Sequence, residues 1–330
     1  MQPQLLQIDG LRTWYPVKGG FWARTHGYVH AVDGVTLEVA PGETVGLVGE
    51  SGCGKTTLGR TIIGLERPRE GTIQLTGKPL DWQSEDGQAL RRRVQMVFQD
   101  PYSSLNPRLT VVDAVTEGLL HHGLIRPAQR LDEASRLLGE VGLDPDALHR
   151  YPHEFSGGQR QRISIARALA LHPELVICDE PVSALDVSVR AQVLNLLVDL
   201  RTRHGLAYLF ISHDLAVVRH LAHRTLVMYM GQLVETGPTA TVLNSPGHPY
   251  SQALLAAVPV PFGERARKLV LPGDVPSPVN PPLACRFHTR CPYVIDLCRQ
   301  VVPPLEPFRS PDHCVACHRK QAIPTLPRPK

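Results

Sequence analysis

Residues 44–57 read TVGLVGESGCGKTT and are the most informative part of the chain for its architecture. The apolar run Thr44–Val48, followed directly by a glycine, is typical of a buried parallel strand. Gly49–Thr56 then fits the pattern G-x-x-x-x-G-K-[ST], and a helical pattern follows. Glycines let backbone N–H groups turn toward phosphate oxygens, Lys55 supplies a point charge, and the Thr56 hydroxyl can ligate Mg²⁺. We therefore predict a phosphate-binding loop between a strand and a helix.

The candidate phosphate-binding residues are Gly49, Glu50, Ser51, Gly52, Cys53, Gly54, Lys55, Thr56 and Thr57. Cys53 occupies a variable position of the pattern, where we expect it to serve only as a small residue.

Other short apolar runs repeat the strand signal. Leu175–Cys178 and Leu209–Ile211 lack polar alternation, which favours buried parallel strands. Helical spacing recurs between the runs, over 131–141 through Leu131, Ala134, Leu138 and Val141, and over 156–171 through Ile163, Ala166 and Ala170. Ser156 is a plausible N-cap of the second helix. Residues 225–235 predict a closing hairpin that turns at Gly231-Gln232. This alternation predicts an α/β fold with a parallel sheet.

Two acids end the run at Leu175–Cys178. Asp179 can present a carboxylate to Mg²⁺, and Glu180 beside it can polarise an attacking water. An apolar run that ends in two acids is common, and the upstream phosphate loop is what makes this pair a candidate catalytic site.

Composition limits the classes of protein to consider. The 330 residues suffice for about two domains, and 42% of them are hydrophobic. The formal charge of +4 is too mild to imply nucleic-acid binding. No segment approaches the ~18–20 consecutive apolar residues of a membrane span, and the N-terminus lacks a signal-peptide layout. We therefore expect a soluble, cytoplasmic protein.

The last part of the chain differs in composition. Residues 259–330 hold 15 of the 30 prolines, five of the seven cysteines, and 11 Lys/Arg against 5 Asp/Glu, a net charge of 11 − 5 = +6. We place a boundary near Val258, with one domain over 1–258 and another over 259–330. So many prolines predict a loop-rich region, and a small loop-rich module usually needs a covalent or metal staple.

A further stretch, Phe155-Ser156-Gly157-Gly158-Gln159, resembles the signature motif of ABC-type ATPases. The other motifs of that family occur in its order, namely the Lys55 loop, Gln99, the signature, Asp179 with Glu180, Ser183–Asp186 and His213. The resemblance implies a RecA-like parallel core, an antiparallel β subdomain and a helical subdomain at about 105–160. It also implies ATP and Mg²⁺ as cofactors.

Roles follow from the matching positions. The resemblance implies that Glu180 is the general base, that Gln99 senses the γ-phosphate and Mg²⁺, and that His213 holds the γ-phosphate and the attacking water. Thr56, Gln99 and Asp179 are the expected Mg²⁺ residues. Two domains of this family pair head-to-tail, so Ser156, Gly157, Gly158 and Gln159 are expected to face a partner's nucleotide. Asp186 is expected at the dimer seam, where it can also be a helix N-cap.

The resemblance narrows to the ATPases of oligopeptide and dipeptide importers through residues 97–107, 247–255 and the cysteine-rich tail. It implies a peripheral subunit on the cytoplasmic face of the membrane. That subunit would hydrolyse ATP to power the import of di- or oligopeptides, or of related solutes such as nickel complexes or glutathione. Its expected partners are a second ATPase subunit, identical or different, and two integral membrane permeases, with an extracytoplasmic solute-binding protein acting indirectly. One alternative is an ABC-type ATPase that serves ribosomes or nucleic acid. Another is a binding module with a vestigial ATPase, although the intact motif residues argue against decay.

An aromatic side chain normally stacks on adenine in this family, and Tyr15 matches best. Trp14, Phe21, Trp22 and Tyr28 are neighbours that could serve instead, and packing into the small sheet is a competing role.

Five cysteines of the tail, Cys285, Cys291, Cys298, Cys314 and Cys317, crowd into 33 residues. A reducing compartment disfavours disulfides, so metal ligation is the better staple. Wide spacing suits a [4Fe–4S] cluster, and the resemblance places the ligands at Cys285, Cys291, Cys298 and Cys317. Cys314 is then a spare thiol or an alternate ligand. Zinc, or simply reduced thiols, is the alternative.

Overall fold

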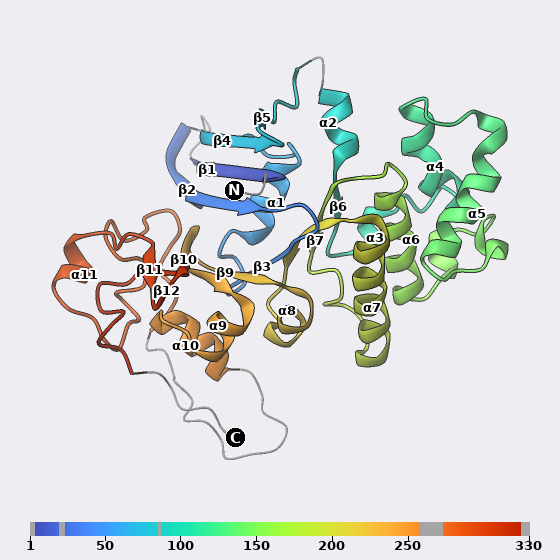
Figure 1. Ribbon diagram of the computed structural model, residues 1–330. Helices are drawn as coiled ribbons and strands as arrows, with labels where there is room; N and C mark the ends of the chain where they lie inside the picture. Colours follow the sequence, from blue (N-terminus) through green and yellow to red (C-terminus); the bar gives the residue numbers. More distant parts are fainter. Residues whose placement is uncertain (1–3, 20–23, 85–86, 258–272, 325–330) are drawn as a thin grey trace. The chain divides into compact units, whose positions relative to one another are not determined.

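The computed structural model describes residues 4–19, 24–84, 87–257 and 273–324 (Figure 1). The chain divides into two compact units. The first comprises residues 1–6, 38–44 and 74–211, and the second comprises 7–37, 45–73 and 212–330. Parallel strands and helices occur in both, so the predicted α/β class is confirmed.

Three parallel strands form the sheet of the first unit. They are β6 (Val94–Val97), β7 (Leu175–Asp179) and β8 (Ala207–Ile211), with β7 between the other two. The first residues of the three strands pair with one another, and every residue of β7 and β8 is buried. Burial on both faces explains why these strands read as unbroken apolar runs.

The helices of the first unit are α2 (Gly87–Arg93), α3 (Pro101–Ser104), α4 (Val111–His121), α5 (Arg130–Glu140), α6 (Gly157–Leu169) and α7 (Val187–His204). Short 3₁₀ turns occupy 127–129, 145–147 and 152–154. Helices α4, α5 and α6 pack on one another (Figure 1). The predicted helices over 131–141 and 156–171 are therefore confirmed, but Leu131, expected on the inner face of the first, is 50% exposed, and Leu137 is buried there instead.

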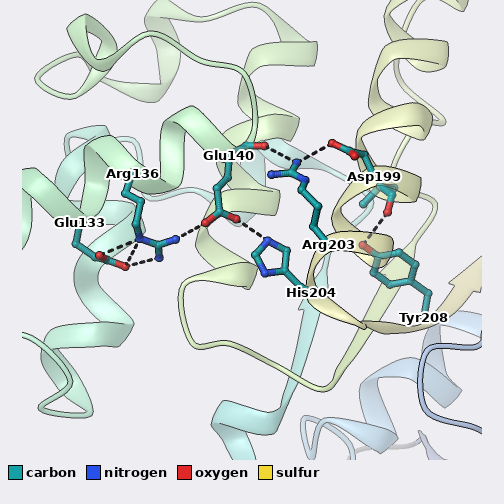
Figure 2. A network of polar contacts seen from close by, with 8 residues as sticks. Glu133, Arg136, Glu140, Asp199, Arg203, His204 and Tyr208 are labelled. Atoms are coloured by element: carbon teal, nitrogen blue, oxygen red, sulfur yellow. Dashed lines mark hydrogen bonds and ion pairs between the residues drawn. The ribbon is translucent and has the colours of Figure 1, made fainter.

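A polar network joins α5 to α7 within this unit (Figure 2). Arg136 bridges Glu133 and Glu140 along α5, and the Glu140 carboxylate lies 2.8 Å from Nε2 of His204 on α7. Arg203 donates to Asp199 at 2.8 Å and to the Glu140 carbonyl oxygen at 3.4 Å. Polar side-chain contacts thus join the end of α5 to the end of α7.

Mixed strand pairing characterises the second unit. Strand β3 (Thr44–Val48) runs parallel to β9 (Arg224–Tyr229), and β9 forms an antiparallel hairpin with β10 (Gln232–Pro238). The hairpin confirms the sequence prediction, but its turn is Met230-Gly231, one residue earlier than expected. Both residues have positive φ, 44° and 81°, as a tight two-residue hairpin turn requires.

The strands of a small sheet lie on both sides of the phosphate loop in the sequence. It contains β1 (Leu6–Gly19), β2 (Arg24–Val39), β4 (Glu70–Leu75) and the two-residue β5 (Lys78–Pro79), in the order β2-β1-β4-β5. The helices of the second unit are α1 (Lys55–Ile62), α8 (Leu215–Leu221), α9 (Thr239–Asn244), α10 (Pro249–Ala256) and α11 (Leu297–Gln300).

The described part of the tail, 273–324, contains only α11 and two short strands, β11 (Glu306–Phe308) and β12 (Ser310–Val315), which agrees with the loop-rich prediction. Strand β12 pairs antiparallel with β10 and lies between β10 and β11, so the tail shares a sheet with the preceding strands. The boundary expected near Val258 lies outside the described residues. No helix in the described ranges is both long enough and apolar enough to cross a membrane.

Candidate functional site

The predicted phosphate loop connects β3 to α1 in the second unit, and its backbone makes close contacts that need glycine. Gly54 has φ of 109°, and a Cβ atom there would collide with the carbonyl oxygen of Ala31. A Cβ at Gly49 would collide with the carbonyl oxygen of Met228 in the same way. Sequence reasoning assigned these glycines to phosphate binding, and the structure adds that packing of the loop itself requires them.

Lys55 opens α1, and its side chain folds back across the loop. Its Nζ atom donates to the carbonyl oxygens of Gly49 at 2.8 Å and Glu50 at 2.9 Å, and lies 3.7 Å from Sγ of Cys53. The Cys53 thiol is buried, and burial raises its pKa, so it stays protonated at neutral pH. The loop thus holds the Lys55 side chain against its own backbone, beside a neutral thiol.

Tyr15 lies on β1, and its hydroxyl reaches the helix that follows the phosphate loop. It hydrogen-bonds the side chains of Thr57 and Glu66, and partial burial raises its pKa. The neighbouring ring of Trp14 is engaged elsewhere, with its centroid 4.1 Å from that of His30 and the guanidinium of Arg69 4.8 Å away. The other candidates Phe21 and Trp22 lie outside the described residues. Among the described candidates, Tyr15 contacts α1 through its hydrogen bond to Thr57.

Two predicted catalytic side chains meet in the first unit. Nε2 of Gln99 donates to Oε2 of Glu180 at 3.2 Å. Glu180 follows β7 directly and has φ of 45°, with its N–H bonded to Ile211 O at 3.0 Å and its carbonyl accepting from the Ser183 hydroxyl at 3.0 Å. Asp179, the last residue of β7, is 2% exposed. The strand end therefore holds both carboxylates in defined positions, with the Gln99 amide on the second.

The signature residues form the start of α6. Ser156 is the N-cap, as predicted: its Oγ accepts from the N–H of Gln159 at 3.3 Å, and the Gln159 side chain accepts from the N–H of Ser156 at 3.0 Å. This reciprocal pair is a capping box. Gly158 packs against Val189 of α7 so closely that a Cβ would overlap the Val189 side chain. Gly157, in contrast, has room, its nearest neighbour being 3.5 Å from such a Cβ.

Asp186 and His213 both precede helices. Asp186 occupies the N-cap position of α7 in extended backbone, but its side chain makes no cap hydrogen bond, so only the position of the expected cap is confirmed. His213 is exposed and lies between β8 and α8, next to Asp214, whose carboxylate caps α8 by accepting from the N–H of Ala216 at 2.9 Å.

The predicted site residues therefore fall into two groups. Tyr15, the phosphate loop and His213 belong to the second unit, whereas Gln99, the signature, Asp179, Glu180 and Asp186 belong to the first.

Sequence reasoning missed two side chains that contact the phosphate loop. The Tyr250 hydroxyl accepts the backbone N–H of Glu50 at 2.7 Å, and Arg290 pairs with the Glu50 carboxylate at 2.9 Å. Both lie about 200 residues or more beyond the loop, so no local pattern could reveal them. The only sequence signal was the resemblance of 247–255 and of the tail to one subfamily.

The tail cysteines gather in the second unit. The pKa of Cys285 is raised to about 12 and that of Cys291 to about 11, mainly by burial and in part by the nearby thiols of Cys298 and Cys317. Sγ atoms of Cys285, Cys291 and Cys317 each accept a backbone N–H from the residue two positions on. Among the described residues, however, no three His, Cys, Asp or Glu side chains are arranged to hold a metal ion.

Two family models match the chain. One, described as ABC transporter, matches residues 32–183. The other, described as the oligopeptide/dipeptide transporter C-terminal region, matches residues 234–298. The first match contains the phosphate loop, the signature and Glu180. The second contains Tyr250 and Arg290.

Full-length relatives are similar throughout. The chain is 51% identical over 321 residues to the probable peptide ABC transporter ATP-binding protein y4tS of Sinorhizobium fredii, covering 96% of this chain and 90% of that one. It is 48% identical over 322 residues to the oligopeptide transport ATP-binding protein AppF of Bacillus subtilis, covering 96% and 98%.

Among solved structures, cbiO1 of Clostridium perfringens, part of an ABC transporter complex, aligns with a TM-score of 0.62 and 25% identity, covering 73% of this chain and 91% of that one. An ATP-binding cassette solved as a post-hydrolysis dimer with ADP and phosphate aligns with a TM-score of 0.63 and 28% identity, covering 71% and 98%.

Proposed function

We propose that this chain, which belongs to the family of ABC transporter ATP-binding proteins, powers the import of oligopeptides or dipeptides. As a member of that family it is an ATPase whose hydrolysis of ATP is coupled to transport. The observation that carries the peptide class is similarity over 96% of the chain to peptide transport proteins, tail included. The ribosome or nucleic-acid alternative is not favoured, because the relatives named above are peptide transport proteins and the second family model is the oligopeptide/dipeptide transporter C-terminal region.

Binding of the nucleotide is assigned to the loop Gly49–Thr57, with Tyr15 as the side chain that stacks on adenine. The donor set suits Mg²⁺-ATP, since a hydroxyl, an amide oxygen and a carboxylate (Thr56, Gln99 and Asp179) are hard oxygen ligands. Bound Mg²⁺ neutralises charge on the phosphates. Lys55 places its ammonium by the same phosphates.

Hydrolysis is assigned to Glu180, which takes a proton from the attacking water as general base. The Gln99 amide at 3.2 Å orients the Glu180 carboxylate and links it to the segment 100–107. His213 is assigned to hold the γ-phosphate and the attacking water.

Assembly completes the site in this proposal. The start of α6, from Ser156 to Gln159, offers N–H groups and a positive helix end to the γ-phosphate on a partner's loop. Asp186 lies at the seam between the two ATPase subunits. The helical subdomain at about 105–160 contacts two membrane permeases, which receive solute from an extracytoplasmic binding protein. These contacts place the chain on the cytoplasmic face of the membrane.

The test is reconstitution. The chain, its partner ATPase and the permeases are placed in proteoliposomes, and ATP-dependent uptake of labelled di- and oligopeptides is measured against a matched complex that carries Lys55→Ala. Uptake should require ATP and an intact Lys55. Specific ATPase activity of the soluble chain should rise with its concentration. Full activity of a monomer, or co-purification with ribosomes instead of permeases, would count against the proposal.

For the tail we propose a structural [4Fe–4S] cluster held by Cys285, Cys291, Cys298 and Cys317. The proposal is supported by the resemblance of the cysteine spacing and by the backbone N–H groups directed at three of the sulfurs, and it requires the thiols to rearrange, since those in the described structure are not placed to hold a metal ion. Protein purified without oxygen should be brown and contain iron and sulfide. Cys291→Ser should lose the colour, whereas Cys314→Ser, the matched control, should keep it. If the protein is instead colourless and contains stoichiometric zinc, the proposed cluster is wrong and the tail holds a structural zinc site.

A further inference from the structure

The tail segment Cys285–Cys291 contacts the phosphate loop through a buried arginine. Arg290 directs two guanidinium nitrogens at the Glu50 carboxylate, with Nη1 to Oε2 at 2.9 Å and Nη2 to Oε1 at 3.3 Å. The Arg290 side chain is only 10% exposed. Two parallel N–H···O bonds between a planar guanidinium and a carboxylate fix orientation as well as distance. The tail therefore holds Glu50, the first variable residue of the loop, in a fixed orientation.

Glu50 is held at its backbone too. Its N–H donates to the hydroxyl of Tyr250, which is fully buried, at 2.7 Å, and its carbonyl accepts from Lys55 Nζ at 2.9 Å. The N–H, the carbonyl and the carboxylate of this residue all have partners inside the protein. Glu50 is thus set to position the loop rather than to touch the phosphates itself.

A second arginine of the same tail segment contacts the hairpin turn, which in turn hydrogen-bonds the loop. Arg286 bonds the carbonyl oxygen of Met230 and pairs with Asp33. Met230 begins the hairpin turn, and the next residue, Gly231, donates its N–H to the carbonyl of Cys53 at 2.8 Å. The loop is therefore supported at residue 50 directly and at residue 53 through the turn.

Packing of one aromatic ring keeps these contacts in place. Phe287 lies between the two arginines in sequence and is 1% exposed. Its ring centroid is 5.3 Å from that of Tyr229 and 5.6 Å from that of Tyr250. Tyr229 in turn lies within 3.5 Å of Arg290 through its hydroxyl. The tail segment, the hairpin and α10 thus pack on one another, and each of them also contacts the loop.

We infer that Arg290 is a positioning residue for the phosphate loop, so that affinity for Mg²⁺-ATP depends on the tail. The inference rests on the proposed role of residues 49–57 in phosphate binding and adds a residue outside every ATPase motif. Removing the guanidinium leaves the Glu50 carboxylate partly buried without its cation, which frees the loop to leave its phosphate-binding geometry.

The test measures binding of a fluorescent ATP analogue with Mg²⁺ to the full chain. Arg290→Met should weaken binding by about tenfold, because a charge-assisted hydrogen bond contributes on this scale. Arg290→Lys should recover part of the loss. Arg299→Met removes the same charge from an exposed tail position and should bind within twofold of wild type. Thermal unfolding of each variant is recorded in parallel.

A double-mutant cycle separates positioning from a general loss of folding. Glu50→Gln leaves the tail packing intact and should weaken binding to a similar degree, and adding Arg290→Met to it should cost no further affinity. In the assembled transporter, Arg290→Met should raise the KM for ATP while kcat at saturating ATP stays near the wild-type value. Equal affinity of wild type, Arg290→Met and Glu50→Gln would overturn the inference. Absence of nucleotide binding by the wild-type chain would instead overturn the proposed function.

Discussion

Glu235 and His313 form a fully buried pair, with Oε1 of Glu235 2.7 Å from Nε2 of His313. The same carboxylate accepts the backbone N–H groups of Gly247 at 2.7 Å and His248 at 2.9 Å. Glu235 lies on β10 and His313 on β12 of the tail, whereas His248 is the N-cap of α10. One carboxylate therefore fixes the turn that leads to Tyr250 and, through it, to the phosphate loop.

We predict that Glu235→Gln lowers the free energy of unfolding by about 2–4 kcal/mol, because an amide nitrogen replaces one oxygen acceptor beside buried donors. Urea unfolding measures the change. Glu306→Gln is the matched control. Glu306 pairs with Lys320 at the surface, and such an ion pair contributes at most about 1 kcal/mol to the free energy of unfolding. Equal unfolding midpoints for the two variants would contradict the structural role of Glu235.

Because His248 is buried, we predict that the stability of the protein depends on pH. Burial lowers the pKa of His248 from 6.5 to about 4, and its Nδ1 accepts the N–H of Tyr250 at 3.0 Å. Between pH 4 and 6.5 the unfolded chain binds a proton that the folded chain does not. The contribution of neutral His248 to the free energy of unfolding is therefore fully present above about pH 6.5. It is lost as the pH falls toward 4, which lowers the free energy of unfolding by about 3 kcal/mol in all.

His248→Asn keeps a side-chain acceptor at the N-cap but does not titrate. Its free energy of unfolding should fall less than that of wild type between pH 7 and 4, as measured by urea unfolding at several pH values. Parallel curves for the two proteins would show that His248 does not contribute.

The elements that the sequence predicted correctly carry their signal locally. Strands β3, β7 and β8 are unbroken apolar runs because both of their faces are buried. Ser156 and Gln159 form a capping box within four residues, so that signal is local too. Gln99 and Glu180 were found by motif, and their contact at 3.2 Å follows from the pairing of β6 with β7.

Other features depend on residues far apart in the chain. Arg290 and Glu50 are separated by 240 positions, and neither belongs to a periodic pattern that would point to the other. The place of β12 between β10 and β11 could not be predicted for a similar reason, because a proline-rich segment gives little strand signal. Leu131 matched the helical spacing of its neighbours yet faces solvent, since spacing alone does not locate the edge of an apolar stripe.

Gly158 offers a test of the start of α6. We predict that Gly158→Ala destabilises the protein by about 1–3 kcal/mol, because the new methyl group overlaps Val189 of α7. Gly157→Ala, whose nearest contact would be an ordinary 3.5 Å, is the matched control. Adding Val189→Ala should restore much of the stability of the Gly158→Ala variant in thermal unfolding. A failure of this rescue would mean that Gly158 is needed for its backbone rather than for its size.

Glu180 is the last residue to test, because its role defines the chemistry. It follows β7 with its backbone fixed at Ile211 and Ser183, and Gln99 donates to its carboxylate. Glu180→Gln preserves shape but removes the base, so ATP hydrolysis by the assembled transporter should fall about 10²-fold or more while nucleotide binding persists. Lys55→Ala should instead weaken binding itself, which separates the two roles in one assay pair. Hydrolysis at the wild-type rate by Glu180→Gln would show that another group takes the proton.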